Sequence, residues 1–253
     1  RDLTDILTAA RDGALGALLV GGLDPDDLPD PGLARQALAR VGFLVSLELM
    51  PSAVTEFADV VFPVAAAAEK SGSYLNWEGR RRPFRASISS SMLPDGRVLH
   101  GLADELDVDL ALPSPEAATT ELARIGRHRS KRDSALPTTR APSQPAVRAG
   151  EAILASWRHL LDEGSLQVDE PALAGTARAA ILRLPKSLAT ELGIAEGEPV
   201  RVTGEVGSVT LPARITEMPD QVVWIPMRSP GSALRTDLGT APGGVVTIRR
   251  AES

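Results

Sequence analysis

The sequence predicts two domains of different class: an α/β domain built on a parallel sheet, followed by a small all-β barrel. Short apolar strands alternate with helical segments over residues 1–113, which is typical of a parallel sheet covered by helices. Residues 114–174 are predicted to be a linker with short helices, because residues 134–149 within them are rich in Pro, Ala, Thr and Ser. Short strands with alternating apolar side chains follow over residues 175–253 and predict the barrel.

Each apolar strand of the first domain is expected to lie between two helices. The predicted helices are residues 2–12, 33–40 and 98–110, and the predicted strands are residues 16–20, 43–47 and 59–64. Strands that are apolar on both faces need cover on both faces, which a parallel sheet obtains from its crossover helices. A further helix is predicted over residues 116–126, inside the linker.

Two turns follow predicted strands at the edge where open α/β sheets bind ligands. The first is Gly21-Gly22-Leu23-Asp24-Pro25, which we interpret as an ordinary glycine turn without a ligand. After the second strand, Ser52 or Thr55 is predicted to cap the next helix.

Residues 54–85 hold the most specific pattern of the chain. An apolar strand ending at Pro63 is followed by a polar break at residues 69–73 and an extended run at residues 74–77. Glu78-Gly79-Arg80 then predicts a tight turn in which Gly79 takes a positive φ. Arg81 and its neighbours would form an exposed basic rim.

This order of residues resembles the molybdopterin (pterin-dependent) oxidoreductase superfamily, whose members carry such a segment in a Rossmann-like domain. The residues that match are Ala58-Asp59-Val60-Val61-Phe62-Pro63, Glu69-Lys70-Ser71-Gly72-Ser73 and Asn76-Trp77-Glu78-Gly79-Arg80. Formate dehydrogenases and nitrate reductases usually place Glu-Arg-Arg after that Asn. The Glu78-Gly79-Arg80 of this chain instead resembles the branch formed by the large iron–sulfur subunits (G subunits) of NADH-quinone oxidoreductase, which is respiratory complex I.

The second domain is predicted from short strands, which would leave many exposed edges unless they closed into a barrel. The predicted strands are residues 179–184, 199–203, 208–216, 221–226 and 245–249, with a helix over residues 185–192 that Gly193 ends. Residues 150–162 are predicted as a short helix in the linker. The order of these elements over about residues 175–250 resembles the molybdopterin-dinucleotide-binding domain of the same superfamily, a six-stranded double-psi barrel. The run from Leu192 to Val200 belongs to this pattern, and by itself it is also similar to swapped-hairpin transcription regulators.

Composition excludes several classes of function. A formal net charge of −6 is unsuited to a general nucleic-acid binder, and no apolar run approaches the roughly 18 residues of a membrane span. The absence of cysteine excludes disulfides and any cysteine-held iron–sulfur cluster in these residues. His100, His128 and His159 are scattered without metal-ligand spacing, so each is predicted to be a surface or a structural histidine.

The resemblance implies a non-catalytic structural part of a large iron–sulfur subunit. The chain begins at Arg1 inside a helical pattern, which predicts that it is the C-terminal part of a longer polypeptide. The resemblance implies that the iron–sulfur clusters lie in the part upstream of it. No catalytic, cofactor-binding or metal-binding residue is assigned. Partners would be other peripheral-arm subunits of complex I, including the NADH-binding flavoprotein subunit, on the cytoplasmic side of the cell membrane. Neither nucleic acid nor direct membrane insertion is expected.

The alternative is the C-terminal half of an active molybdenum or tungsten enzyme such as a formate dehydrogenase. The barrel would then hold the molybdopterin cofactor, and Arg228 or Arg235 would meet one of its phosphates. We favour ordinary surface ion pairs for both arginines. The basic run over residues 127–132 is likewise interpreted as a solvated surface.

Overall fold

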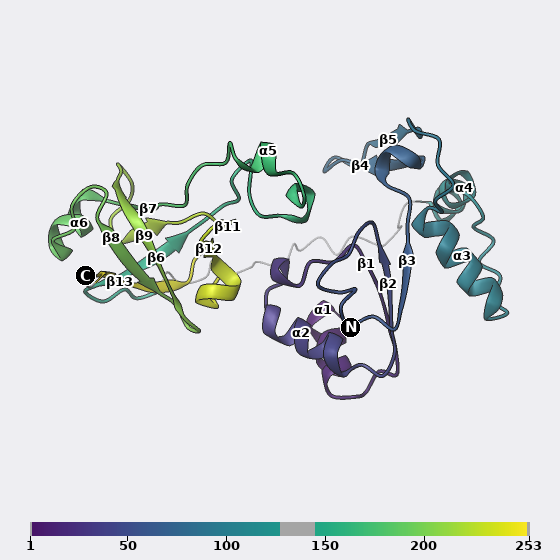
Figure 1. Cartoon of the computed structure of the whole chain (residues 1–253), viewed down its shortest axis with the longest axis horizontal. Coiled ribbons are helices and arrows are strands. Elements are labelled where there is room, and N and C mark those ends of the chain that lie inside the picture. Colours follow the sequence, from purple (N-terminus) through teal and green to yellow (C-terminus); the bar gives the residue numbers. More distant parts are fainter. Residues whose placement is uncertain (1, 127–144, 252–253) are drawn as a thin grey trace, which may run out of the picture. The chain divides into compact units, whose positions relative to one another are not determined.

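The computed structural model describes residues 2–126 and 145–251 (Figure 1). The chain divides into two compact units, Arg1–Asp24 with Arg35–Thr139, and Pro25–Ala34 with Arg140–Ser253. The segment Pro25–Ala34 therefore belongs with the barrel, although its sequence neighbours on both sides belong to the α/β unit. The basic run, His128 and residues 133–144 of the predicted linker lie outside the described residues.

The α/β unit contains a three-stranded parallel sheet in the order β1-β2-β3. The strands are β1 (Leu18–Gly21), β2 (Leu44–Glu48) and β3 (Val60–Pro63). Leu18 pairs with Leu44, and Val45 pairs with Val60. All three strands overlap the predicted ranges, and their assignment to a Rossmann-like class stays a prediction.

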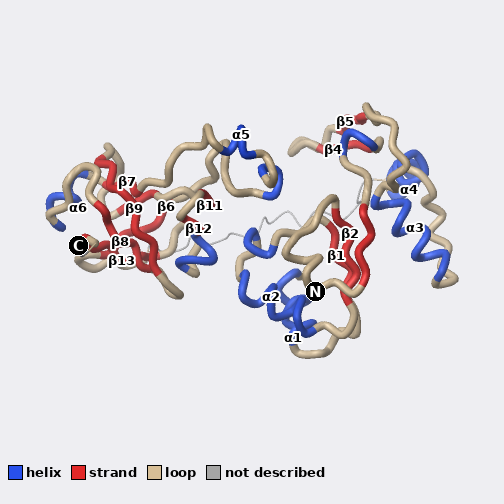
Figure 2. The backbone as a smooth tube through the Cα atoms, in the orientation of Figure 1, coloured by secondary structure: helices blue, strands red, loops and turns tan. Residues whose placement is uncertain are grey.

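Side chains from helices cover both faces of this sheet. The helices of the unit are α1 (Leu3–Arg11), α2 (Pro31–Arg40, of which residues 35–40 belong to this unit), α3 (Asp95–Glu105) and α4 (Pro115–Ile125), shown in blue in Figure 2. Leu38 of α2 packs with Leu44 in one cluster, and Val98 of α3 packs with Leu47 in another. Since Leu44 and Leu47 are three residues apart in one strand, the two clusters lie on opposite faces.

Two helix predictions need correction at their ends. Helix α3 begins at Asp95 and ends at Glu105, whereas the pattern predicted residues 98–110. The structure stops it at Leu106 because Asp107 takes a positive φ of 56°, which an α-helix does not continue through. No helix follows Ser52 either, where the chain forms a turn over residues 53–57 that Ser52 and Thr55 close through mutual hydrogen bonds. The predicted caps are therefore present, but they cap a turn.

The second unit contains a closed six-stranded barrel in the order β10-β6-β13-β8-β9-β7. Its strands are β6 (Glu151–Ala155), β7 (Leu182–Leu184), β8 (Pro199–Thr203), β9 (Ser208–Ile215), β10 (Val222–Trp224) and β13 (Val245–Arg250). Helix α6 (Lys186–Leu192) ends at Gly193, whose φ of 65° confirms the predicted left-handed cap. The core is formed by fully buried aliphatic side chains, among them Leu154, Val202 and Ile248.

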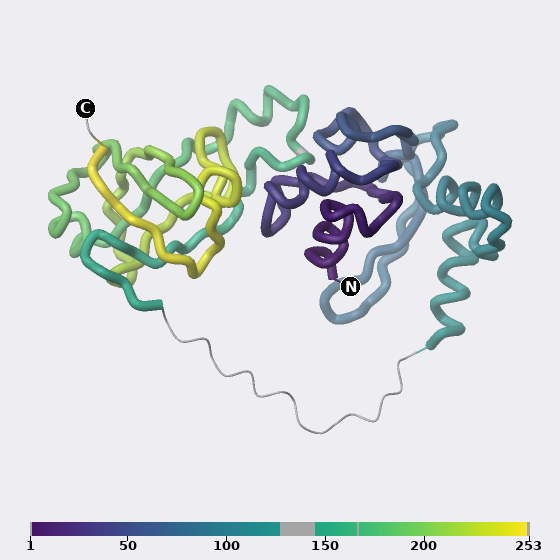
Figure 3. Tube along the Cα trace, turned by 90° about the horizontal axis from the view of Figure 1, so that it is seen from below, coloured from purple at the N-terminus to yellow at the C-terminus, as the bar shows by residue number. Residues whose placement is uncertain are grey.

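The first barrel strand corrects a prediction. Residues 151–155 form β6, which pairs in parallel with β10 and antiparallel with β13, whereas the sequence predicted a helix over residues 150–162 and a barrel that began at residue 175. In Figure 3 the yellow C-terminal segment, which contains β13, lies in the same unit as β6, and these two strands pair although they are far apart in the sequence. The alternate burial of Ala152 and Leu154 has the period of a strand, but five residues are too few to exclude a helix from sequence alone.

Shorter elements complete the fold. They are the 3-10 turns η1 (Pro25–Asp27), η2 (Ala67–Glu69) and η3 (Ser165–Gln167), the helix α5 (Pro171–Ala174), the strand pair β11 (Arg228–Ser229) and β12 (Ser232–Ala233), and the π-helical turn η4 (Leu234–Leu238).

Glu198, just before β8, is held by the barrel in its ionised form. Its carboxylate accepts a hydrogen bond from the backbone N of Ala195 at 2.8 Å and pairs with Arg250. The hydrogen bond from Ala195 is the main cause that lowers the pKa of Glu198 below its usual value, and Arg250 adds to it against the opposing effect of desolvation.

A lowered pKa makes barrel stability depend on pH. Ionised Glu198 stabilises the fold above the pKa of the unfolded chain, and this contribution disappears as pH falls through the lowered folded value. We expect Glu198→Gln to flatten the acid limb of the stability curve, measured by denaturant melts at a series of acidic pH values. Glu205→Gln, at an exposed carboxylate in the turn after β8, is the matched control. Equal acid slopes in the parent and in Glu198→Gln would contradict the assignment.

Candidate functional site

The motif of residues 69–84 folds into a hairpin whose polar residues build the loop itself. Strand β4 (Gly72–Leu75) pairs antiparallel with β5 (Arg81–Phe84). Glu69 accepts a hydrogen bond from the backbone N of Ala66 at 2.8 Å, and Lys70 forms an ion pair with Asp95 at the start of α3. The hydrogen bond from Ala66 is the main cause that lowers the pKa of Glu69.

Gly72 and Asn76 also have structural roles in this hairpin. A Cβ on Gly72 would lie 2.8 Å from the ring of Phe84, so only glycine allows that ring to pack there. The side-chain oxygen of Asn76 accepts hydrogen bonds from the backbone N atoms of Glu78 and Arg80, at 3.1 and 2.8 Å. This Asx geometry shapes the turn between β4 and β5.

Gly79 has the predicted positive φ, at 78°. Because a β-branched residue is strained there, we expect Gly79→Val to destabilise the hairpin by about 1–3 kcal/mol. Gly79→Asn is the matched control, since asparagine tolerates this region better than other non-glycine residues. Hydrogen exchange of the amides of β4 and β5 measures the cost locally. Equal protection in the parent and in Gly79→Val would show that the turn has been assigned wrongly.

The outer surface of the hairpin combines exposed aromatic and basic side chains. Trp77 is 94% exposed at the turn, and Tyr74 and Leu75 are 64% and 63% exposed. Arg81 and Arg82 are also exposed in β5. A cavity of about 510 Å³ at the base of the hairpin is lined mostly by apolar atoms, including those of Tyr74 and Phe84. Aromatic residues and arginine are the side chains that protein interfaces favour.

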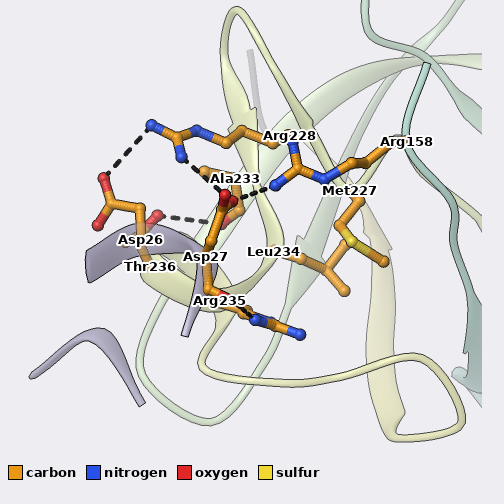
Figure 4. Close-up of a pocket in the computed structure, with 9 residues that line it drawn as sticks. All are labelled: Asp26, Asp27, Arg158, Met227, Arg228, Ala233, Leu234, Arg235 and Thr236. Atoms are coloured by element: carbon orange, nitrogen blue, oxygen red, sulfur yellow. Dashed lines mark hydrogen bonds and ion pairs between the residues drawn. The ribbon is translucent and has the colours of Figure 1, made fainter. Parts of the chain in front are cut away.

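A second candidate site is a small cavity in the barrel unit where arginines and aspartates converge (Figure 4). Arg158 follows β6, Arg228 lies in β11 and Arg235 lies in η4. They face Asp26 and Asp27 of η1, and the cavity has a volume of about 140 Å³. We call these three arginines and two aspartates the arginine cluster.

Apolar anchors hold the cluster in place. Leu234 and Leu238 of η4 are 1% and 0% exposed, which fixes the turn that carries Arg235. Pro25 and Leu28, which flank Asp26 and Asp27 in the sequence, are buried. The opposing charges are therefore presented by backbone segments that pack firmly in the same unit.

Ion pairs within the cluster converge on Asp27. Its carboxylate pairs with Arg158 and, at 3.3 Å, with Arg228, and its carbonyl oxygen accepts a hydrogen bond from Arg235. Arg228 also lies 3.7 Å from a carboxylate oxygen of Asp26.

Asp162 adds a further carboxylate to the arginine cluster, at 2.6 Å from Arg158. Burial opposes the charge of Arg158, but the hydrogen bond to Asp162 and the attraction of Asp27 outweigh it and raise the pKa of Arg158.

Arg228 forms ion pairs, as predicted. Its side chain is not at the surface, however, where the prediction placed it. The Arg228 side chain is only 17% exposed, and its partners come from a segment about 200 residues earlier in the chain. Sequence reasoning missed Arg158, Asp26 and Asp27 as site residues. The run Asp26-Asp27 is an acidic turn like many others, and nothing in the sequence connects it to arginines that far away.

In the turn Gly21-Gly22-Leu23-Asp24-Pro25 the backbone agrees with a glycine turn, and the expectation that no ligand binds there stays a prediction. Gly22 takes a positive φ of 60°, as an ordinary glycine turn requires.

The two described histidines lie in structural contacts. His100 lies 3.6 Å from Asp104 one helical turn away, and the ring of His159 packs on Trp224 at 5.4 Å. Over residues 2–126 and 145–251, no group of three or more His, Cys, Asp or Glu side chains is arranged to hold a metal ion. Within the same ranges, no helix has the length and apolar character needed to span a bilayer.

Comparisons with known proteins place these features in a family context. Residues 3–92 match the family model described as molybdopterin oxidoreductase, and residues 159–250 match the molydopterin dinucleotide binding domain. The chain is 50% identical to the G subunit of NADH-quinone oxidoreductase from Mycobacterium bovis, over 98% of its own length and 31% of that protein. It is 48% identical to the G subunit from Streptomyces coelicolor, over 98% of its length and 30% of that protein.

A solved structure shows a similar fold. Acetylene hydratase from Pelobacter acetylenicus aligns with a TM-score of 0.54 and 14% identity, over 88% of this chain and 39% of that one. The chain thus spans about a third of the length of the curated relatives that it matches over almost its whole length.

Proposed function

Because the chain belongs to the molybdopterin oxidoreductase family, we propose that it is a non-catalytic structural part of the large iron–sulfur subunit of an NADH-quinone oxidoreductase. In that role it supports electron transfer from NADH to quinone through iron–sulfur clusters held outside these residues. It would belong to the peripheral arm of a membrane-bound complex, on the cytoplasmic side of the cell membrane.

Similarity to the G subunits of NADH-quinone oxidoreductases carries this proposal. Two such relatives, at 50% and 48% identity, both align over 98% of the chain. Glu78-Gly79-Arg80 agrees with that branch of the family.

The folds of the two units support the same family. We infer that the α/β unit is Rossmann-like, since its three strands are parallel and side chains from α2 and α3 cover opposite faces. We infer that the barrel is of the double-psi class. Its closed order of six strands includes two parallel neighbour pairs, β6 with β10 and β7 with β9.

The hairpin supports a structural role for the family motif. Glu69, Lys70, Gly72, Asn76 and Gly79 each shape or anchor the loop through contacts within the α/β unit. These residues therefore stabilise the hairpin. The hairpin in turn exposes aromatic and basic side chains on its outer surface.

We infer that this hairpin docks a partner subunit of the complex through an acidic face. Arginine pairs with carboxylates in a bidentate geometry, and an exposed tryptophan supplies the apolar contact that interfaces concentrate near their centre. The other peripheral-arm subunits, including the NADH-binding flavoprotein subunit, are the partners that this role predicts.

Assembly tests the proposal. We expect Trp77→Ala and Arg81→Ala in the full-length subunit to reduce its recovery with the other subunits, by about tenfold or more for Trp77. The unfolding midpoint should remain unchanged, because both side chains are exposed. Arg201→Ala, at an exposed arginine of β8, is the matched control. Full assembly of both hairpin variants would contradict the docking role of the hairpin.

The match to a dinucleotide-binding domain also favours an alternative, an active molybdenum or tungsten enzyme. That alternative requires a barrel site open to the phosphates of the cofactor.

A further inference from the structure

A dinucleotide cofactor, which the family model of the barrel implies, needs room and unengaged cationic groups. The cavity of the arginine cluster measures about 140 Å³. Sites for small molecules and cofactors are larger, at roughly 300–1,000 Å³. Arginine side chains can bind phosphate groups. The cavity that these arginines line is nevertheless too small for a dinucleotide, because protein atoms fill the space around it.

The electrostatic balance of the cluster leads to the same conclusion. The guanidinium groups of Arg158 and Arg228 pair with the carboxylates of Asp26, Asp27 and Asp162, and Arg235 donates to the carbonyl oxygen of Asp27. An added phosphate would bring further negative charge next to these carboxylates, and like charges at short range repel. The residues present do not fit a bound phosphate unless a carboxylate leaves or is neutralised.

Asp27 holds the place where a phosphate would bind best. It is the residue that all three arginines contact, through its carboxylate for Arg158 and Arg228 and through its carbonyl oxygen for Arg235. Carboxylate and phosphate oxygens satisfy the same planar, forked guanidinium donors. The buried Pro25 and Leu28 on either side of the acidic pair hold the carboxylate in position.

We propose that Asp27 is an internal anion that occupies the arginine cluster in place of the phosphate groups of a dinucleotide. The chain as it stands binds no diphosphate at this site, and neutralising Asp27 converts the cluster into a diphosphate-binding site. The inference rests on the proposed structural role and extends that role to the barrel. Its test measures anion binding, whereas the role itself is tested by subunit assembly, so that either can fail alone.

Calorimetric titration with inorganic pyrophosphate tests the proposal on the whole chain. Asp27→Asn keeps the shape of the side chain and removes its charge, and we expect it to bind pyrophosphate at least about tenfold more tightly than the parent. The double variant Asp27→Asn with Arg228→Gln should lose this gain. Asp30→Asn is the matched control and should behave as the parent. It neutralises a carboxylate of the same segment that accepts a hydrogen bond from the backbone N of Leu33 and is not among the carboxylates that form the ion pairs of the arginine cluster.

Pyrophosphate binding by the parent protein provides a second test, in which Arg228→Gln must keep the unfolding midpoint of the parent. Pyrophosphate binding by the parent that Arg228→Gln abolishes would overturn the proposal, because the site would then be open with Asp27 in place. Asp27→Asn that retains the unfolding midpoint of the parent and gains no pyrophosphate binding would overturn it as well.

Discussion

Leu154→Ala is expected to destabilise the barrel by about 2–5 kcal/mol, because it removes a fully buried side chain and leaves a cavity in a closed core. Leu154 lies in β6, between β10 and β13, and its backbone exchanges hydrogen bonds with Gly243 and Gly244 at 2.8 Å. These bonds hold the strand in place, so that neighbouring side chains have little freedom to fill the space.

Denaturant melts of the whole chain, followed by a probe in the barrel, measure this loss. Leu160→Ala removes the same side chain six residues later at a position that is 97% exposed, and it should change stability by less than about 0.5 kcal/mol. Equal effects of the two substitutions would mean that residues 151–155 do not form the first strand of the barrel.

Gly204→Val is expected to destabilise the same barrel by about 3 kcal/mol through overpacking. A Cβ at Gly204 would lie against the carbonyl oxygen of Leu238 and 2.7 Å from its Cβ. Leu238 is fully buried, so η4 cannot move away without losing its own anchor.

Gly101→Ala is the control for this substitution. Gly101 lies inside α3, and a Cβ there meets nothing within 4 Å. We expect it to be neutral or slightly stabilising, because alanine has the higher helix propensity. Thermal melts distinguish the two outcomes, and a Gly204→Val protein as stable as the parent would contradict the close packing of η4 over the turn after β8.

Much of the fold follows from local sequence, because the deciding interactions are short in range. Gly193 ends α6 and Gly79 turns the hairpin, and in each case the backbone requirement is visible in the residue type alone. The family motif of residues 69–80 also acts locally, through caps and Asx hydrogen bonds over a few residues.

The features missed by sequence reasoning depend on contacts between distant residues. Residues 150–162 gave no reason to prefer a strand, since β6 becomes one only by pairing with β10 and β13. The pair Arg158–Asp27 joins residues 131 positions apart. The close approach of Leu238 to Gly204 is likewise visible only in the folded barrel.

Metal analysis of the purified chain tests the non-catalytic role most directly. Elemental analysis by mass spectrometry should find iron, molybdenum and tungsten well below one atom per chain, because the sequence contains no cysteine and the arginine cluster is occupied by Asp27. One molybdenum or tungsten atom per chain would contradict the account and support an active pterin enzyme in its place.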